Sequence, residues 1–70
     1  MKITKYFISE FVSSAGIPAA IQTAENRRNE FLNTSKDLIS EIESESIQII
    51  YSGPHNNTLA ALISLTFYSK

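Results

Sequence analysis

The pattern of apolar and polar residues along the chain predicts three β-strands and one long helix. Residues 2–12 are rich in β-branched and aromatic side chains, with apolar residues on both alternating faces. Residues 46–52 and 59–68 have the same character, and the segment between them, residues 53–57, is dense in turn-forming residues. We therefore expect a first strand at the start of the chain and a β-hairpin formed by the two later strands.

The long helix is predicted from Gly16 to about Asn33. Pro18 fits the first helical turn, where the N–H groups have no intrahelical acceptor. Apolar residues then recur at three- and four-residue spacings on one side of the helix: Ile17, Ala20, Ile21, Ala24, Phe31 and Leu32. Arg28 interrupts this apolar stripe, and we expect its aliphatic stem to cover apolar surface while the guanidinium reaches the edge.

Residues 36–46 fit two interpretations. Thr34, followed three residues later by Asp37, resembles a capping box and favours a short second helix. Three glutamates at every second position instead have the period of a strand with one charged face: Glu41, Glu43 and Glu45. We favour the short helix. The predicted fold class is then α+β, a single β-α-(α)-β-β domain over residues 1–70 with one main helix packed on an antiparallel sheet.

The last predicted strand is apolar on both of its faces. Because one helix covers only one face of a sheet, Leu62 and Tyr68 would be left in water in a monomer. A chain of 70 residues buries only ~60% of its unfolded surface, and this one has no cysteine and a single histidine with which to add disulfides or a metal. We therefore expect a homo-oligomer that associates across the sheet or along its edge.

Charge and hydropathy exclude several classes of partner. The formal net charge is −1, which argues against general nucleic-acid binding. The longest fully apolar stretch, Leu59 to Ile63, is too short to span a bilayer, so no membrane partner is expected. Glu10 interrupts the N-terminal apolar segment that would otherwise resemble a secretion signal. We expect a cytoplasmic protein.

The candidate chemistry is sparse. His55 is the only histidine, and the chain contains no cysteine nucleophile, no paired catalytic carboxylates and too few glycines for a phosphate-cradling loop. The glutamates between residues 41 and 45 could coordinate a cation, but a solvated charged face explains them more simply. We expect no enzymatic activity, no metal and no cofactor.

Two regions could instead bind a ligand. Arg27 and Arg28 form the only adjacent basic pair, and a guanidinium can grip a phosphate or carboxylate. Local ion pairs with Glu25 and Glu30 are the simpler interpretation. The functional alternative is that oligomer symmetry joins these arginines to Tyr51 and to the polar turn, where three side chains can hydrogen-bond a small anionic ligand: His55, Asn56 and Asn57.

Three fragments of the chain carry a family resemblance: residues 29–33, residues 47–52, and residues 61–63 with the later Tyr68. Together they resemble the short sporulation-controlled proteins of spore-forming bacteria and their phage-borne relatives, in which a helix with a similar end precedes two strands. The similarity covers about the last forty residues, and residues 36–46 are an additional segment. That family has no assigned catalytic residues, so the resemblance transfers none to this chain.

These observations predict a non-catalytic, oligomeric binding module that sequesters a small anionic, nucleotide-like ligand. The small size and the resemblance are compatible with a phage-encoded inhibitor of a host system, an analogy of size and class. The alternative is a protein–protein interaction module or regulator that acts on a host protein through its sheet face or edge.

Overall fold

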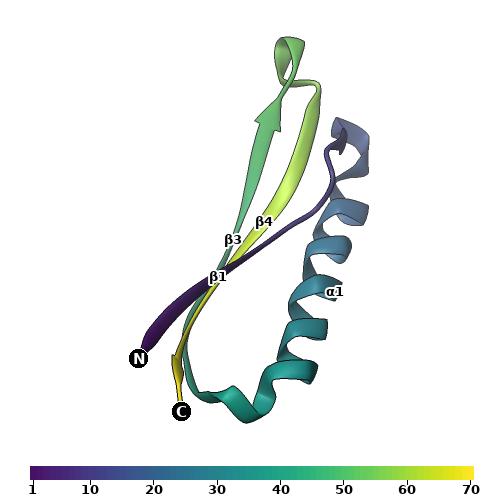
Figure 1. The fold of residues 1–70 in the computed structure, drawn as a ribbon. Coiled ribbons are helices and arrows are strands. Elements are labelled where there is room, and N and C mark those ends of the chain that lie inside the picture. Colours follow the sequence, from purple (N-terminus) through teal and green to yellow (C-terminus); the bar gives the residue numbers. More distant parts are fainter.

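One long α-helix lies against one face of an antiparallel β-sheet in the computed structural model, which describes all 70 residues (Figure 1). The helix and strands are β1 (Lys2–Ile8), β2 (Val12–Ser13), α1 (Ile17–Ser35), β3 (Ile39–Ser52) and β4 (Thr58–Ser69). Short 3-10 turns occupy Ser14–Gly16, Lys36–Leu38 and Pro54–Asn56. The predicted α+β class, with one main helix packed on an antiparallel sheet, is confirmed.

The last strand in the sequence lies at the centre of the sheet. β1 and β2 pair with one side of β4, and β3 pairs with its other side, all antiparallel. Ile63 of β4 therefore has Phe7 of β1 on one flank and Ile47 of β3 on the other. This central position explains why β4 is the most apolar strand of the chain.

The short second helix predicted within residues 36–46 is wrong. The chain makes only a 3-10 turn at Lys36–Leu38 and then enters β3, which continues to Ser52. The strand interpretation of this segment is therefore the correct one, and pairing with the long β4 outweighs the local capping-box signal. Two irregularities in the β3–β4 register, between Ile39 and Glu41 and between Ile42 and Ser44, accommodate extra residues in this strand.

The first strand is also shorter than predicted, because it ends at Ile8 and pairing resumes only at Val12. Ser9 occupies the break and is buried. Its N–H donates to the Ala61 carbonyl at 2.9 Å, and its hydroxyl accepts from the Ala61 N–H at 2.9 Å and donates to the Glu10 carbonyl at 3.0 Å. A side chain thus replaces one backbone acceptor, which keeps the buried polar groups satisfied across the break.

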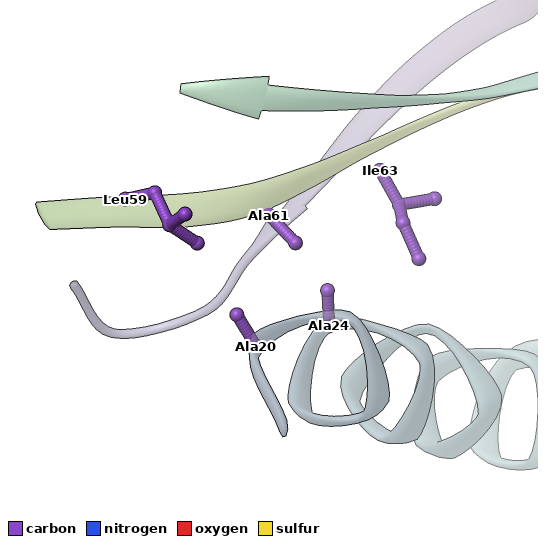
Figure 2. Close-up of a cluster of buried hydrophobic side chains, with 5 residues drawn as sticks. All are labelled: Ala20, Ala24, Leu59, Ala61 and Ile63. Carbon is purple, nitrogen blue, oxygen red and sulfur yellow. The ribbon is translucent and has the colours of Figure 1, made fainter. Parts of the chain in front are cut away.

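Small residues bring the first half of α1 close to the sheet. Ala20 and Ala24 of the helix face Ala61 of β4, with Leu59 and Ile63 on either side (Figure 2). All five are almost completely buried, and they form the hydrophobic core. Full burial of a side chain the size of Ile63 contributes about 1.5–3 kcal/mol, so this cluster is a main source of stability.

Aromatic residues separate the second half of α1 from the sheet. The Phe31 ring lies 5.5 Å from the Phe7 ring and 5.7 Å from the Phe67 ring, measured between centroids, and both pairs are tilted. Such pairs contribute about 0.5–1.5 kcal/mol beyond their buried area. Phe31 itself remains half-buried, so this end of the interface is less closed than the alanine end.

The molecule is elongated, with extents of 44 × 18 × 12 Å. Its Cα radius of gyration is 13.6 Å, whereas a compact domain of this length would have about 11 Å. Only nine of the 70 residues are buried, so much apolar surface stays exposed. α1 does not have the length of continuous apolar sequence that a bilayer-crossing helix needs.

Candidate functional site

Arg27, one of the predicted ligand-binding residues, is engaged within the fold. Its guanidinium donates a hydrogen bond to the Ile8 carbonyl and lies 3.6 Å from the Glu10 carboxylate. Ile8 is the last residue of β1, and Glu10 lies in the break between β1 and β2. Arg27 therefore fastens this break to α1, a structural role that accounts for the residue without a ligand.

Arg28 is engaged as well, and more deeply. Its guanidinium lies 2.8 Å from the Glu45 carboxylate of β3 and 3.8 Å from Glu25 one helical turn earlier, and it also donates to the Asn29 side chain. The side chain is only 18% exposed. The predicted ion pair with Glu25 is present, while the second carboxylate comes from β3 rather than from Glu30. This arrangement ties α1 to the sheet.

The turn residues predicted to bind a ligand lie at the tip of the β3–β4 hairpin. His55, Asn56 and Asn57 are exposed, and Gly53, His55 and Asn56 have left-handed backbone conformations with φ of 82°, 57° and 53°. Within the turn the Asn56 N–H donates to the Gly53 carbonyl at 3.1 Å. These features build a tight turn whose side chains are free to reach solvent or a partner.

The structure does not bring the arginines and the hairpin tip together within one copy of the chain. Glu45, the partner of Arg28, is seven residues before Ser52 at the end of β3. At about 3.3 Å per residue, the tip lies roughly 23 Å further along the strand. Tyr51 is exposed near the tip on the helix side of the sheet, opposite Leu59. A site that shares these residues therefore requires a second copy.

The glutamates of β3 do not share one face as the sequence predicted. Residue 43 falls at the second register irregularity, so Glu43 projects on the face away from α1 while Glu45 projects toward α1. Glu43 lies 2.9 Å from the Lys2 ammonium and accepts a hydrogen bond from the Tyr68 hydroxyl at 2.8 Å. No group of three or more His, Asp or Glu side chains is placed to hold a metal ion.

These contacts shift three protonation equilibria. Hydrogen bonds, first from Lys2 and then from Tyr68, lower the pKa of Glu43. The hydrogen bond to Glu43 and the negative charge of its carboxylate raise the pKa of Lys2 and that of Tyr68. All three groups lie at the surface, so they form a solvent-exposed network on the sheet rather than a reactive site.

One of three cavities in the structure lies at the end of the helix–sheet interface where α1 leaves the sheet. It has a volume of about 380 Å³. Its apolar walls are Ile3, Phe31, Leu38 and Phe67, and its polar groups are Lys5, Ser35, Ser69 and Lys70. We call it the end pocket. The end pocket lies where the Phe31 and Phe67 rings stand between the helix and the sheet.

The two lysines of the end pocket have no acidic partner. Arg27, Arg28 and Lys2 each form a salt bridge with a glutamate, whereas Lys5 and Lys70 form none. The Lys5 ammonium instead lies 5.8 Å from the centre of the Phe31 ring, within the range of a cation–π contact. An apolar pocket with two available ammonium groups can bind a small molecule that combines an apolar or aromatic body with a carboxylate or phosphate.

Sequence reasoning missed the end pocket. Lys5 is two residues from both Ile3 and Phe7. In a strand this spacing places it on the same face as those apolar residues. That pattern was a usable signal, because a lysine among inward-facing apolar residues is unusual. The contribution of Phe31 and Phe67 depended on the separation between helix and sheet, which spacing along the chain does not show.

Comparison with known proteins gave no matching family model, no matching curated protein and no matching solved structure. The resemblance to the sporulation-controlled proteins therefore stays a prediction.

Proposed function

We propose that this protein is a non-catalytic binding module that sequesters a small anionic ligand in the end pocket. The observation that supports this proposal is the pair of lysines, Lys5 and Lys70, beside an apolar cavity and without acidic partners. Arg27 and Arg28, which the sequence favoured, are already paired with carboxylates, so a ligand anion would have to displace an existing partner there.

The composition of the pocket defines the class of ligand. Phe31, which is half-exposed beside the nearly buried Phe67, offers aromatic surface to a ring or an apolar body, and the hydroxyls of Ser35 and Ser69 can hydrogen-bond polar groups along its edge. The ammonium groups favour a phosphate or carboxylate at one end. A mononucleotide or cyclic nucleotide combines these features, and sequestration requires no reacting group from the protein.

Calorimetric titration tests the proposal. The purified chain is titrated with linear and cyclic nucleotides and with medium-chain fatty acids as a second class of amphipathic anion. Lys5→Ala should weaken binding by roughly ten- to a hundredfold, the effect of losing one charge-assisted hydrogen bond of about 1.5–3 kcal/mol. Lys36→Ala is the matched control, because Lys36 is an exposed lysine near the same end of α1 that does not line the pocket.

Three results would count against the end pocket. Wild-type protein could bind no probe, Lys36→Ala could weaken binding as much as Lys5→Ala, or Arg28→Ala could abolish binding while Lys5→Ala has no effect. The last result would return the site to the predicted residues around Arg28. Fatty-acid binding without nucleotide binding would keep the pocket and change the ligand class.

The alternative function, a protein–protein interaction module acting through the sheet, is favoured by a separate observation. β3 lies at the edge of the sheet, makes few contacts with α1, and exposes Ile47 and Tyr51. A host protein that adds a strand here would use the backbone of β3 for affinity. Capture of such a protein by wild-type chain, and its loss with Ile47→Lys but not with Lys5→Ala, would support this alternative over ligand sequestration.

A further inference from the structure

The outer edge of β3 is the largest unpaired backbone surface of the molecule. β3 has 14 residues, far more than the usual five or six of a strand, and only β4 pairs with it. α1 packs chiefly on β4 and β1 and leaves β3 at the open side of the sheet. An exposed edge of this length is normally either protected or used for pairing.

The hydrogen bonds on the other side of β4 show which β3 residues face outward. Ser9 donates to the Ala61 carbonyl at 2.9 Å and Ser69 donates to the Met1 carbonyl at 2.8 Å, so odd-numbered residues of β4 direct their peptide groups toward β1. Even-numbered residues of β4 therefore direct theirs toward β3, because N–H and C=O of one residue point the same way in an antiparallel strand. Lys70, which donates to the Leu38 carbonyl at 2.9 Å, follows the same rule.

This alternation divides the residues of β3 into two sets. Ser46, Gln48 and Ile50 pair with even-numbered residues of β4 and use their peptide groups inside the sheet. The peptide groups of the alternate residues, Ile47, Ile49 and Tyr51, then point out from the free edge. The free edge thus carries regularly spaced donors and acceptors on three successive outward positions.

The same three residues project apolar side chains on the helix side of the sheet, since they pair with Ile63, Ala61 and Leu59 of the core face. Ile47 is 52% exposed and Tyr51 is 54% exposed. Ile49 between them is half-buried and packs against the core. Unpaired backbone groups and the exposed side chains of Ile47 and Tyr51 therefore belong to one segment, residues 47–51. We call this segment the β3 edge.

We propose that a second copy of this chain pairs antiparallel with the β3 edge about a two-fold axis at Ile49. Ile49 then faces Ile49 of the second copy, and Ile47 faces Tyr51 in both directions. The interface is isologous, because each copy offers the same segment, and it joins the two four-stranded sheets into one continuous sheet.

Charge and backbone parity select this register. A residue whose peptide group points out from the free edge must face another such residue of the second copy. With the axis at Ile47, Ile49 would lie opposite Glu45. With the axis at Gln48, Tyr51 would lie opposite Glu45. Glu45 is already paired with Arg28 at 2.8 Å. An axis at Ile50 would leave Ile47 facing Gly53. Only the axis at Ile49 makes the three apolar residues face one another and leaves Glu45 at the end of the paired segment.

Other surfaces of the sheet fit a second copy less well. The edge formed by β1 is interrupted after Ile8, which blunts it as a template for pairing. The sheet face away from α1 is mixed: Thr4 and Thr66 share a hydrogen bond at 2.9 Å, whereas Ile8, Ile50 and Leu62 form an apolar area nearer the hairpin. The backbone groups of that face are already paired within the sheet. The β3 edge differs because it offers unpaired backbone groups together with apolar side chains, so a second copy satisfies both at once there.

This dimer also changes the position of the hairpin tip. With the axis at Ile49, Gly53 of one copy lies opposite Glu45 of the other. The turn that contains His55, Asn56 and Asn57 then approaches the Arg28–Glu45 pair of the second copy. Residues that lie far apart in one chain become neighbours, in two equivalent places. The dimer itself does not depend on whether the end pocket binds a ligand.

Sedimentation velocity measures the association. At about 100 µM the sedimentation coefficient of the wild-type protein should correspond to a dimer, with twice the chain mass of 7.8 kDa. Ile47→Lys places a charged side chain opposite Tyr51 of the second copy in both halves of the interface and should raise the dimer dissociation constant about tenfold or more. Tyr6→Lys is the control, because Tyr6 is at least as exposed as Ile47 but lies on β1. A wild-type monomer at this concentration, or an equal effect of both variants, would overturn the proposal.

A cysteine variant tests the register directly, because the chain has no cysteine of its own. Facing hydrogen-bonded residues have Cα atoms about 5.5 Å apart, within the range of a disulfide. Ile49→Cys should therefore form a covalent dimer under mild oxidation. In Ile47→Cys the two cysteines would be four residues out of register, about 14 Å apart, and should not cross-link. Cross-linking of Ile47→Cys in preference to Ile49→Cys would refute the axis at Ile49.

Discussion

The two ends of the helix–sheet interface are built from side chains of opposite size. At one end Ala20 and Ala24 meet Ala61, and the contact is fully buried. At the other end Phe31 meets Phe7 and Phe67, and a cavity of about 380 Å³ remains beside the rings. Both ends use the same helix and the same central strand, and the larger side chains occur at the end where the helix–sheet interface is less closed.

This difference separates stability from binding within a small chain. The alanine end has no space for additional atoms, and its contribution depends on close packing. The phenylalanine end keeps apolar surface and two lysines, Lys5 and Lys70, accessible to a ligand. Substitutions at the alanine end should therefore change mainly the free energy of unfolding, and substitutions at the phenylalanine end should change both unfolding and binding.

The largest expected effect comes from overfilling the alanine end. Ala24→Leu inserts three carbon atoms where Ala24 is completely buried against β4, and it should destabilise the protein by about 3 kcal/mol, the upper part of the usual range for overpacking. Chemical denaturation monitored by circular dichroism measures this loss. Ala19→Leu is the matched control, since Ala19 is exposed on the same helix and leucine is nearly as good a helix former as alanine. Equal stability of the two variants would show that the helix does not pack on the sheet through Ala24.

A smaller effect is expected at the phenylalanine end. Truncation of a fully buried phenylalanine costs about 3–5 kcal/mol, but Phe31 is half-buried, so Phe31→Ala should cost about 2 kcal/mol. Thermal melts measure the change in midpoint. Phe11→Ala, at a more exposed phenylalanine in the break between β1 and β2, should cost less than half as much. A Phe31→Ala loss as large as that of Ala24→Leu would mean that this end is as tightly packed as the other.

The smallest expected effect on stability is electrostatic. It comes from the network of Lys2, Glu43 and Tyr68 on the sheet face away from the helix. Because the pKa of Glu43 is lowered in the folded protein, its stabilising contribution is present above the ordinary carboxyl pKa of about 4.3 and is lost as the pH falls. The raised pKa values of Lys2 and Tyr68 act in the opposite range, so their contribution is lost at alkaline pH.

Thermal midpoints at about pH 7 and pH 3.5 check the acid side of this prediction. Glu43→Gln should lose less stability than wild type between the two values, because its side chain does not titrate. Glu30→Gln is the control, since the Glu30 carboxylate has no ion-pair partner. If Glu30→Gln reduced the acid sensitivity as much as Glu43→Gln, the Lys2–Glu43–Tyr68 network would have no special role.

The sequence predicted the strongly patterned parts of the fold and failed where local and long-range signals disagree. The apolar spacing of α1 and the β-rich composition of β4 gave the correct elements, because one face of each is buried. Residues 36–46 carried a capping-box signal that is purely local. Their strand conformation depends on pairing with β4, more than twenty residues later in the sequence.

The candidate site was harder to predict for a related reason. Arginine pairs are visible in a sequence, but their partners are not. Glu10 and Glu45, which engage Arg27 and Arg28, lie seventeen residues away from them in the chain, one in the break between β1 and β2 and the other in β3. In the sequence, Lys5 is a single lysine within a strand and has no motif around it. Only the position of Phe31 beside it identifies the end pocket. Which basic side chains remain free to bind a ligand is therefore decided by the fold.

The position of β4 also has a consequence for the order of events during synthesis. Every other strand pairs with β4, yet β4 follows all of them in the sequence, and β1 pairs Lys2 with Tyr68. While residues 58–69 are still inside the ribosome, β1, α1 and β3 have no common partner and cannot form the sheet. Such distant pairing predicts slow folding relative to chain length, with the β3 edge and the apolar side of α1 exposed to chaperones until the last strand emerges.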